Sequence, residues 1–143
     1  MSRSLIQKRH QARFLLIQAL YQWQVAEHAA EQVLNQFQLN PQFAQADQTY
    51  FTESLQAITE RTAELDAYYA PYLDRSLTEL DPIEMSILRL ASYELSERLD
   101  LPYRVVINEA LNLAKIFGAT DGHKYINGVL DKVTKKLRPI ETQ

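Results

Sequence analysis

A group of basic residues near the start of the chain has the types and spacing that bind phosphate. Lys8, Arg9 and Arg13 fall in the first turns of a predicted helix, where Arg9 and Arg13 share one face. A guanidinium suits phosphate because its planar fork donates several hydrogen bonds. Tyr21 follows on the same helix with a ring that can stack on a base. The four residues predict a contact surface for nucleic acid.

A second group lies within residues 117–125, where two aromatic residues, a lysine and two glycines surround a predicted helix start. Free N–H groups at a helix N-terminus attract phosphate, and aromatic faces stack on unpaired bases. Arginine, lysine and aromatic residues together suit single-stranded RNA better than duplex DNA. By spacing alone, burial in the core is the alternative role for Phe117 and Tyr125.

Patterns for catalysis and metal binding are missing from the sequence. There is no cysteine, so disulfides and thiolate metal sites are excluded. His10, His28 and His123 have no partner at a metal-binding spacing, and no serine stands in a nucleophile elbow. No glycine precedes Gly118, which excludes glycine-rich phosphate loops from most of the chain. We predict no catalytic residues, no metal, no cofactor and no enzymatic activity.

The net charge of −3 conceals two basic ends and an acidic middle. Residues 1–26 carry a charge of +4, residues 27–131 carry −10, and residues 132–143 carry +3. A fold that brings the ends together makes one basic patch on an acidic body, which attracts phosphate. The alternative is that the basic ends are solvated tails.

Length and composition indicate one domain of ordinary size. The 143 residues are 46% hydrophobic, which is enough to form a core without disulfides. No apolar run is long enough to cross a membrane. Glutamines interrupt the apolar residues near the N-terminus, which argues against a signal peptide. We therefore expect a cytoplasmic protein that does not act in a membrane.

Hydrophobic periodicity predicts an all-α fold of six or seven helices. The predicted helices cover about 5–26, 29–37, one or more segments within 51–69, 82 to about 100, 104–117, and 121 or 122 to 137. The first helix is apolar on nearly every side, which is typical of a central helix. We expect one domain over residues 1–143, with approximate subdomains 1–75 and 76–143 packed together.

Local signals mark several helix ends. Asp81 is predicted to cap the helix that starts at Pro82, with Glu84 completing a pair like a capping box. Thr120 or Asp121 is predicted to cap the last helix. Residues 51, 55, 58, 62, 65 and 69 form a stripe with a period near 3.5. We interpret the stripe as internal packing rather than as an exposed coiled-coil partner site.

Gly128 is an unusual residue inside the last predicted helix. A glycine there costs about 1 kcal/mol relative to alanine. Such a residue indicates close approach by another backbone. The sequence leaves open whether that backbone is a neighbouring helix, which is the interpretation we favour, or a nucleic-acid strand.

The sequence resembles the NusB family of bacterial transcription antitermination factors over almost the whole chain. The matching blocks, in order, are the basic N-terminal turn, residues 18–24, 88–95, 106–115, 117–119 and 123–131. The resemblance implies an all-helical fold of two packed subdomains without catalytic activity. It also implies binding of boxA RNA together with NusE, a protein of the small ribosomal subunit. Other Nus factors and RNA polymerase are then indirect partners, notably in the transcription of ribosomal RNA.

The resemblance also implies which residues bind. Carried over to matching positions, the RNA-binding residues are Lys8, Arg9, Arg13, Tyr21, Phe117, Asp121, Lys124 and Tyr125. The family often has Phe where Tyr125 stands, and stacking should survive that difference. The expected NusE contacts are Tyr72, Arg75, Glu79 and Glu84, in the acidic part that suits a basic ribosomal protein. Some members of the family self-associate, so a homodimer is a further expectation.

Two other classes of function compete with this reading. A helical protein–protein adaptor would use the acidic middle and gain nothing from RNA. A helix-turn-helix DNA-binding protein would need a short glycine turn before an exposed basic helix, and the sequence lacks one.

Overall fold

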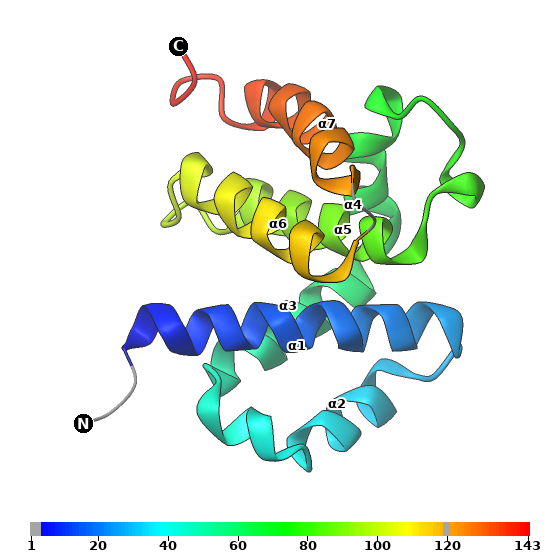
Figure 1. Cartoon of the computed structure of the whole chain (residues 1–143), viewed down its shortest axis with the longest axis vertical. Helices are drawn as coiled ribbons and strands as arrows, with labels where there is room; N and C mark the ends of the chain where they lie inside the picture. The colour runs from blue at the N-terminus through cyan, green and yellow to red at the C-terminus, as the bar shows by residue number, and fades with distance from the viewer. Residues whose placement is uncertain (1–3, 119–120) are drawn as a thin grey trace. The chain divides into compact units, whose positions relative to one another are not determined.

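The computed structural model describes residues 4–118 and 121–143, and every regular element within those ranges is helical. The elements are α1 (Leu5–Val25), α2 (Ala30–Gln38), the 3₁₀ turn η1 (Pro41–Gln45), α3 (Gln48–Glu60), α4 (Thr62–Tyr69), η2 (Ala70–Tyr72), η3 (Leu77–Glu79), α5 (Pro82–Glu97), α6 (Tyr103–Phe117) and α7 (Gly122–Leu137). Figure 1 shows them in chain order from blue to red. The prediction of an all-α fold is confirmed.

The chain divides into two compact units, one ending at Glu60 and the other beginning at Arg61. The division falls where Arg61 leaves helical geometry, with φ −121° and ψ 28°, between α3 and α4. Residues 61–75 pack with the second unit, since α4 and η2 contact α5 or α7. The approximate subdomain boundary expected near residue 75 stays a prediction.

The first unit is built around α1, which packs against α2, η1 and α3. The middle of α1 is buried on most sides, from Ala12 to Leu20, as its apolar sequence predicts. Its C-terminal end differs from the prediction, because Val25 is 51% exposed and Trp23 only partly buried. The helix ends there, so its last turn has fewer neighbours.

The stripe of residues with a period near 3.5 is confirmed as internal packing. Five of its members are buried, and Thr62 is half-buried. The buried members are Phe51, Leu55, Ile58, Leu65 and Tyr69. The stripe runs over two helices, α3 and α4, and Pro71 lies in η2 just beyond the end of α4.

The second unit is built around α5, which packs against α4, α6 and α7. Every residue from Met85 to Leu95 is buried. Asp81 caps this helix as predicted, because its carboxylate accepts hydrogen bonds from the backbone N–H groups of Ile83 and Glu84, both at 3.1 Å. The predicted reciprocal bond from the Glu84 side chain is absent from α5.

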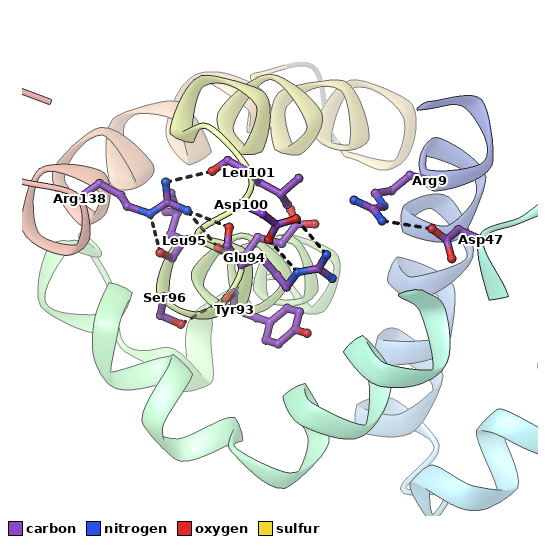
Figure 2. Close-up of polar contacts among 10 residues, drawn as sticks. Arg9, Asp47, Tyr93, Glu94, Leu95, Ser96, Asp100, Leu101 and Arg138 are labelled. Carbon is purple, nitrogen blue, oxygen red and sulfur yellow. Dashed lines mark hydrogen bonds and ion pairs between the residues drawn. The ribbon is translucent and has the colours of Figure 1, made fainter. Parts of the chain in front are cut away.

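The end of α5 is secured by Arg138, which follows α7 and is 6% exposed (Figure 2). Its guanidinium donates to the carbonyl oxygens of Leu95 at 2.8 Å and Leu101 at 3.0 Å. It also donates to the Glu141 carboxylate at 2.5 Å. The bond to Leu95 satisfies a carbonyl group in the last turn of α5, which is how a cation stabilises a helix C-terminus, and the bond to Leu101 holds the loop that follows.

Helix α6 buries one apolar set of residues and leaves another half-buried. The buried residues are Val106, Ala110, Leu113 and Ala114, whereas Ile107, Leu111 and Phe117 are half-buried. Because both sets are apolar, hydrophobic periodicity alone could not tell which one lies deeper. At the end of α6, Gly118 lies so close to the previous turn that a Cβ atom would meet the Ala114 carbonyl oxygen at 2.6 Å. This close approach explains the glycine at the C-cap of α6.

Candidate nucleic-acid interface

Arg9 is held in place by two neighbours within the first unit. Its Nη2 atom lies 3.3 Å from Asp47 Oδ2, as Figure 2 shows, and the two side chains are 20% and 15% exposed. Its guanidinium carbon is 4.4 Å from the centre of the Tyr50 ring. The backbone N–H of Asp47 also donates to the Lys8 carbonyl at 2.9 Å. The segment before α3 therefore fixes the first turns of α1.

Arg13 is buried, with 3% of its surface exposed. Its guanidinium carbon lies 5.4 Å from the centre of the same Tyr50 ring. A basic residue in the first turns of α1 is expected in contact with water, and this expectation is wrong for Arg13, because a buried aromatic ring from α3 covers it. A cation over an aromatic face is attracted to the ring quadrupole, so Arg13 stabilises the packing of α1 on α3.

Lys8 and Tyr21 are both more accessible than Arg13. Lys8 is half-buried, and Tyr21 is 39% exposed. A phenol ring at this exposure presents part of its face to solvent, where a base can stack on it.

In the second unit, the turn from α6 to α7 exposes a lysine and a carboxylate. The side chains of Lys124 and Asp121 are 74% and 77% exposed, and Lys124 Nζ lies 3.5 Å from Asp121 Oδ1. Asp121 precedes α7, but its side chain makes no capping hydrogen bond, so its part of the capping prediction is wrong. Thr120, the other predicted cap, lies outside the described residues, as does Ala119 of the family motif.

Tyr125 is half-buried on the first turns of α7, where the 73–76 segment contacts it. The Asp74 backbone N–H donates to the Tyr125 hydroxyl at 3.3 Å. The Arg75 guanidinium carbon is 4.5 Å from the centre of the ring. Burial raises the pKa of the Tyr125 hydroxyl above its ordinary value. The ring is therefore positioned by the segment that supplies part of the expected protein interface.

The residues expected to contact NusE lie around the same place. Tyr72 ends η2 and is half-buried, and Arg75 forms a bidentate ion pair with Asp74 at 2.6 and 3.2 Å. Glu79 accepts hydrogen bonds from the Ser76 backbone and hydroxyl, and these lower the pKa of its carboxyl.

Glu84 has the opposite environment from Glu79. Burial, with a smaller effect from nearby Asp81, raises the pKa of its carboxyl. Its Oε2 atom lies 3.6 Å from the position that a Cβ atom on Gly122 would take. The start of α5 therefore contacts the start of α7.

Two separate clusters emerge from the residues predicted to bind RNA. Arg9 and Arg13 meet on Tyr50 in the first unit, next to Lys8 along α1. Asp121, Lys124 and Tyr125 share the first turn of α7 in the second unit, just after Phe117 at the end of α6. Each cluster is formed entirely by residues of one unit.

Sequence reasoning missed three residues that organise these clusters. Asp47 and Tyr50 hold the arginines of α1, and Asp74 contacts Tyr125. For Asp47 a signal was present, because an aspartate just before a periodic helical segment is a typical N-cap. The Tyr50 backbone N–H indeed donates to Asp47 Oδ1 at 3.0 Å. Nothing in the sequence links position 74 to position 125.

A cavity of about 380 Å³ lies between α2 and α3. Its lining residues are Ala30, Glu31, Leu34, Thr52, Leu55, Gln56, Thr59 and Glu60. The lining contains two carboxylates and neither a cation nor an aromatic ring, so it does not suit phosphate or bases.

The described part of the chain holds neither a metal-binding cluster nor a membrane-spanning helix. Within residues 4–118 and 121–143, no group of three or more His, Asp or Glu side chains is placed to hold a metal ion. Among the same residues, no helix combines the length and hydrophobicity needed to span a membrane.

Known proteins match this chain over most of its length. The NusB family profile matches residues 10–135. The transcription antitermination protein NusB of Pseudoalteromonas atlantica is 52% identical over 133 residues, which cover 93% of this chain and 95% of that protein. NusB of Pseudomonas entomophila is 50% identical over 136 residues, which cover 95% of this chain and 82% of that protein.

A solved structure agrees with these sequence matches. NusB of T. maritima superposes with a TM-score of 0.83 at 27% identity and covers 99% of both chains. Fold and sequence therefore lead to the same assignment, and the resemblance in the sequence blocks is confirmed: the chain belongs to the NusB family.

Proposed function

We propose that this protein is a transcription antitermination factor that acts by binding rather than by catalysis. Its relatives near 50% identity carry the name transcription antitermination protein. The match extends over both units of the chain, which supports transfer of that function to the whole protein.

The RNA partner we propose is single-stranded boxA RNA. The observation that carries this proposal is the first turn of α7, where an exposed lysine stands next to a tyrosine ring. A lysine binds phosphate as a point charge, and a tyrosine face stacks on a base. Half of the contacts come from each unit: Lys8, Arg9, Arg13 and Tyr21 in the first, and Phe117, Asp121, Lys124 and Tyr125 in the second.

Burial changes the roles within this proposed set. Arg13, at 3% exposure, acts as a positioning residue that holds α1 on α3. Lys8 and Arg9 then supply the phosphate contacts of α1. Asp121 pairs with Lys124 at 3.5 Å, so its carboxylate moderates the positive charge at the start of α7.

The protein partner we propose is NusE, bound through Tyr72, Arg75, Glu79 and Glu84. Arg75 stacks on Tyr125, so a protein bound at residues 72–84 acts on the segment that positions an RNA-binding ring. RNA and NusE should therefore bind better together than separately. Other Nus factors and RNA polymerase join the complex indirectly, in the cytoplasm, notably during ribosomal RNA transcription.

Fluorescence anisotropy tests this proposal. A short boxA-like single strand and a scrambled strand are each titrated with the protein, with and without NusE. We expect tighter binding to the boxA-like strand and a further gain in affinity when NusE is present. If the protein binds NusE but binds both strands equally, it is a protein–protein adaptor and not an RNA-binding factor. Duplex DNA as a competitor separates the proposal from DNA binding.

A further inference from the structure

The exposed face of α7 carries a glycine that the fold does not need. Gly128 is exposed in the middle of the helix. A Cβ atom added to it would have no heavy atom within 4 Å beyond its chain neighbours and the backbone of its own helix. The expectation that Gly128 allows tight packing of a neighbouring helix is therefore wrong.

An unexplained glycine in a helix reduces stability, because alanine is the better helix former. Gly118 offers a contrast, since a side chain there would collide with the Ala114 carbonyl. No such internal reason exists at Gly128. Open space at this position leaves room for another molecule to approach the backbone of α7.

The surroundings of Gly128 indicate the chemistry of that molecule. On a helix surface its neighbours are three and four residues away, at Lys124, Tyr125, Asp131 and Lys132. The two lysines are exposed one turn before and one turn after the glycine, and lie about 12 Å apart along the axis. A bare stretch of backbone between two ammonium groups and beside an aromatic ring suits a phosphodiester chain.

Asp131 is the one carboxylate next to the glycine on this face. It lies 3.3 Å from Lys135 Nζ, so a cation of the same helix offsets its charge. Lys132 therefore keeps its attraction for phosphate.

We infer that single-stranded RNA crosses α7 at Gly128, where the missing side chain lets the sugar–phosphate chain approach the helix backbone between Lys124 and Lys132. This inference rests on the proposed function and extends the RNA contact two turns beyond the residues assigned from the family. Lys132 becomes a further phosphate contact, and Gly128 sets how closely the strand approaches.

The test uses variants that change stability and affinity in opposite directions. Gly128→Ala and Gly128→Leu fill open space and improve helix propensity, so the midpoint of thermal unfolding should rise by about 3–5 °C. Each variant is titrated with the boxA-like strand in the presence of NusE. The affinity for RNA should fall about fivefold or more in Gly128→Ala, because the added methyl group would crowd the contact with the strand. It should fall further in Gly128→Leu, which adds a larger side chain.

Two variants control this test. Asn127→Ala also improves helix propensity, but position 127 faces about 100° away from position 128 around the axis of α7. This variant should keep its RNA affinity within about twofold of the wild type. Lys132→Ala should make the slope of log affinity against log salt less negative by about 0.7, the value expected for one lost phosphate contact.

Three outcomes would overturn the inference. Gly128 variants that are more stable but bind RNA like the wild type would show that RNA does not contact this face of α7. Variants that lose NusE binding in the absence of RNA, with RNA affinity unchanged, would assign the face to a protein instead. A wild-type protein that does not distinguish the boxA-like strand from the scrambled strand would defeat the proposed function itself, and this result is visible before any variant is made.

Discussion

The two clusters proposed to contact RNA differ in how strongly their cationic side chains interact with the rest of the protein. On α1, Arg9 is 20% exposed and paired with Asp47, and Arg13 is buried over Tyr50. On α7, the side chain of Lys124 is 74% exposed, and the neighbouring residue Tyr125 is half-buried. In the first cluster the charges are built into the structure, and in the second they remain in solvent.

The comparison shows that a basic residue at an expected binding position can stabilise the fold instead of contacting a ligand. Arginines that share a helix face look equivalent in sequence, yet Arg13 is buried, whereas Arg9, over the same ring, keeps 20% of its side chain exposed. Mutation of Arg13 should therefore act mainly on stability, and mutation of the exposed residues on α7 should act mainly on RNA affinity.

Arg13→Glu should have the largest effect. Reversing a buried charge removes a cation from the Tyr50 ring and buries a carboxylate in its place, which should cost about 3 kcal/mol or more in the free energy of unfolding. Chemical denaturation measures this cost. Lys124→Glu is the matched reversal on an exposed side chain, and it should change stability by less than about 0.5 kcal/mol while weakening RNA binding. An Arg13→Glu variant that has normal stability but fails to bind RNA would contradict this account, because Arg13 would then contact RNA instead of supporting the fold.

Tyr125→Ala should have the next largest effect. Loss of a stacking ring costs about 1–3 kcal/mol in binding, which is about fivefold or more in affinity for the boxA-like strand. Tyr125→Phe keeps the ring but loses the contact with the Asp74 backbone. We expect it to bind RNA normally and to lose about 0.5–1 kcal/mol of stability. Normal RNA affinity in Tyr125→Ala would exclude stacking at this position.

The salt dependence of RNA binding should be moderate. Phosphate contacts from Lys8, Arg9, Lys124 and Lys132 predict a slope of about −3 in log affinity against log salt for a single strand. Lys124→Ala should bring the slope to about −2. A wild-type slope near zero would contradict the ionic part of both proposals.

Glu84 should give the smallest effect, on the dependence of stability on pH. Its carboxyl has a pKa raised mainly by burial, with Asp81 adding to the shift and Arg75 opposing it. The folded state then holds this proton more tightly than the unfolded state, so stability falls as pH rises from the unfolded pKa through the folded one. Glu84→Gln should flatten this fall in stability, as measured by denaturation curves at a series of pH values above the ordinary pKa of a glutamate. An unchanged pH profile would mean that Glu84 is well solvated.

The helices could be predicted because their local signals are strong. Asp81-Pro82 set the start of α5, and the apolar middle of α1 predicted a central helix. The separation of α3 and α4 could not be predicted, because the apolar stripe continues through Arg61 without a proline or glycine. Periodicity describes which face is buried, and it does not report a change in backbone direction.

The candidate site was predicted in its residue types and only partly in its environment. Burial of Arg13 depends on Tyr50, and the setting of Tyr125 depends on Asp74 and Arg75. These partners are distant in sequence, so no local pattern could reveal them. Gly128 shows the converse, because the sequence marked it as unusual and the structure removed the internal explanation.

The central claim is that the exposed first turns of α7 bind single-stranded RNA while Arg13 supports the fold. NMR spectra of the labelled protein, titrated with the boxA-like strand, test it most directly. The account predicts the largest changes in amide shifts from Asp121 to Lys132, with smaller changes at Lys8 and Tyr21 and none at the Arg13 side chain. Shift changes confined to the cavity between α2 and α3, or no changes with RNA, would contradict it.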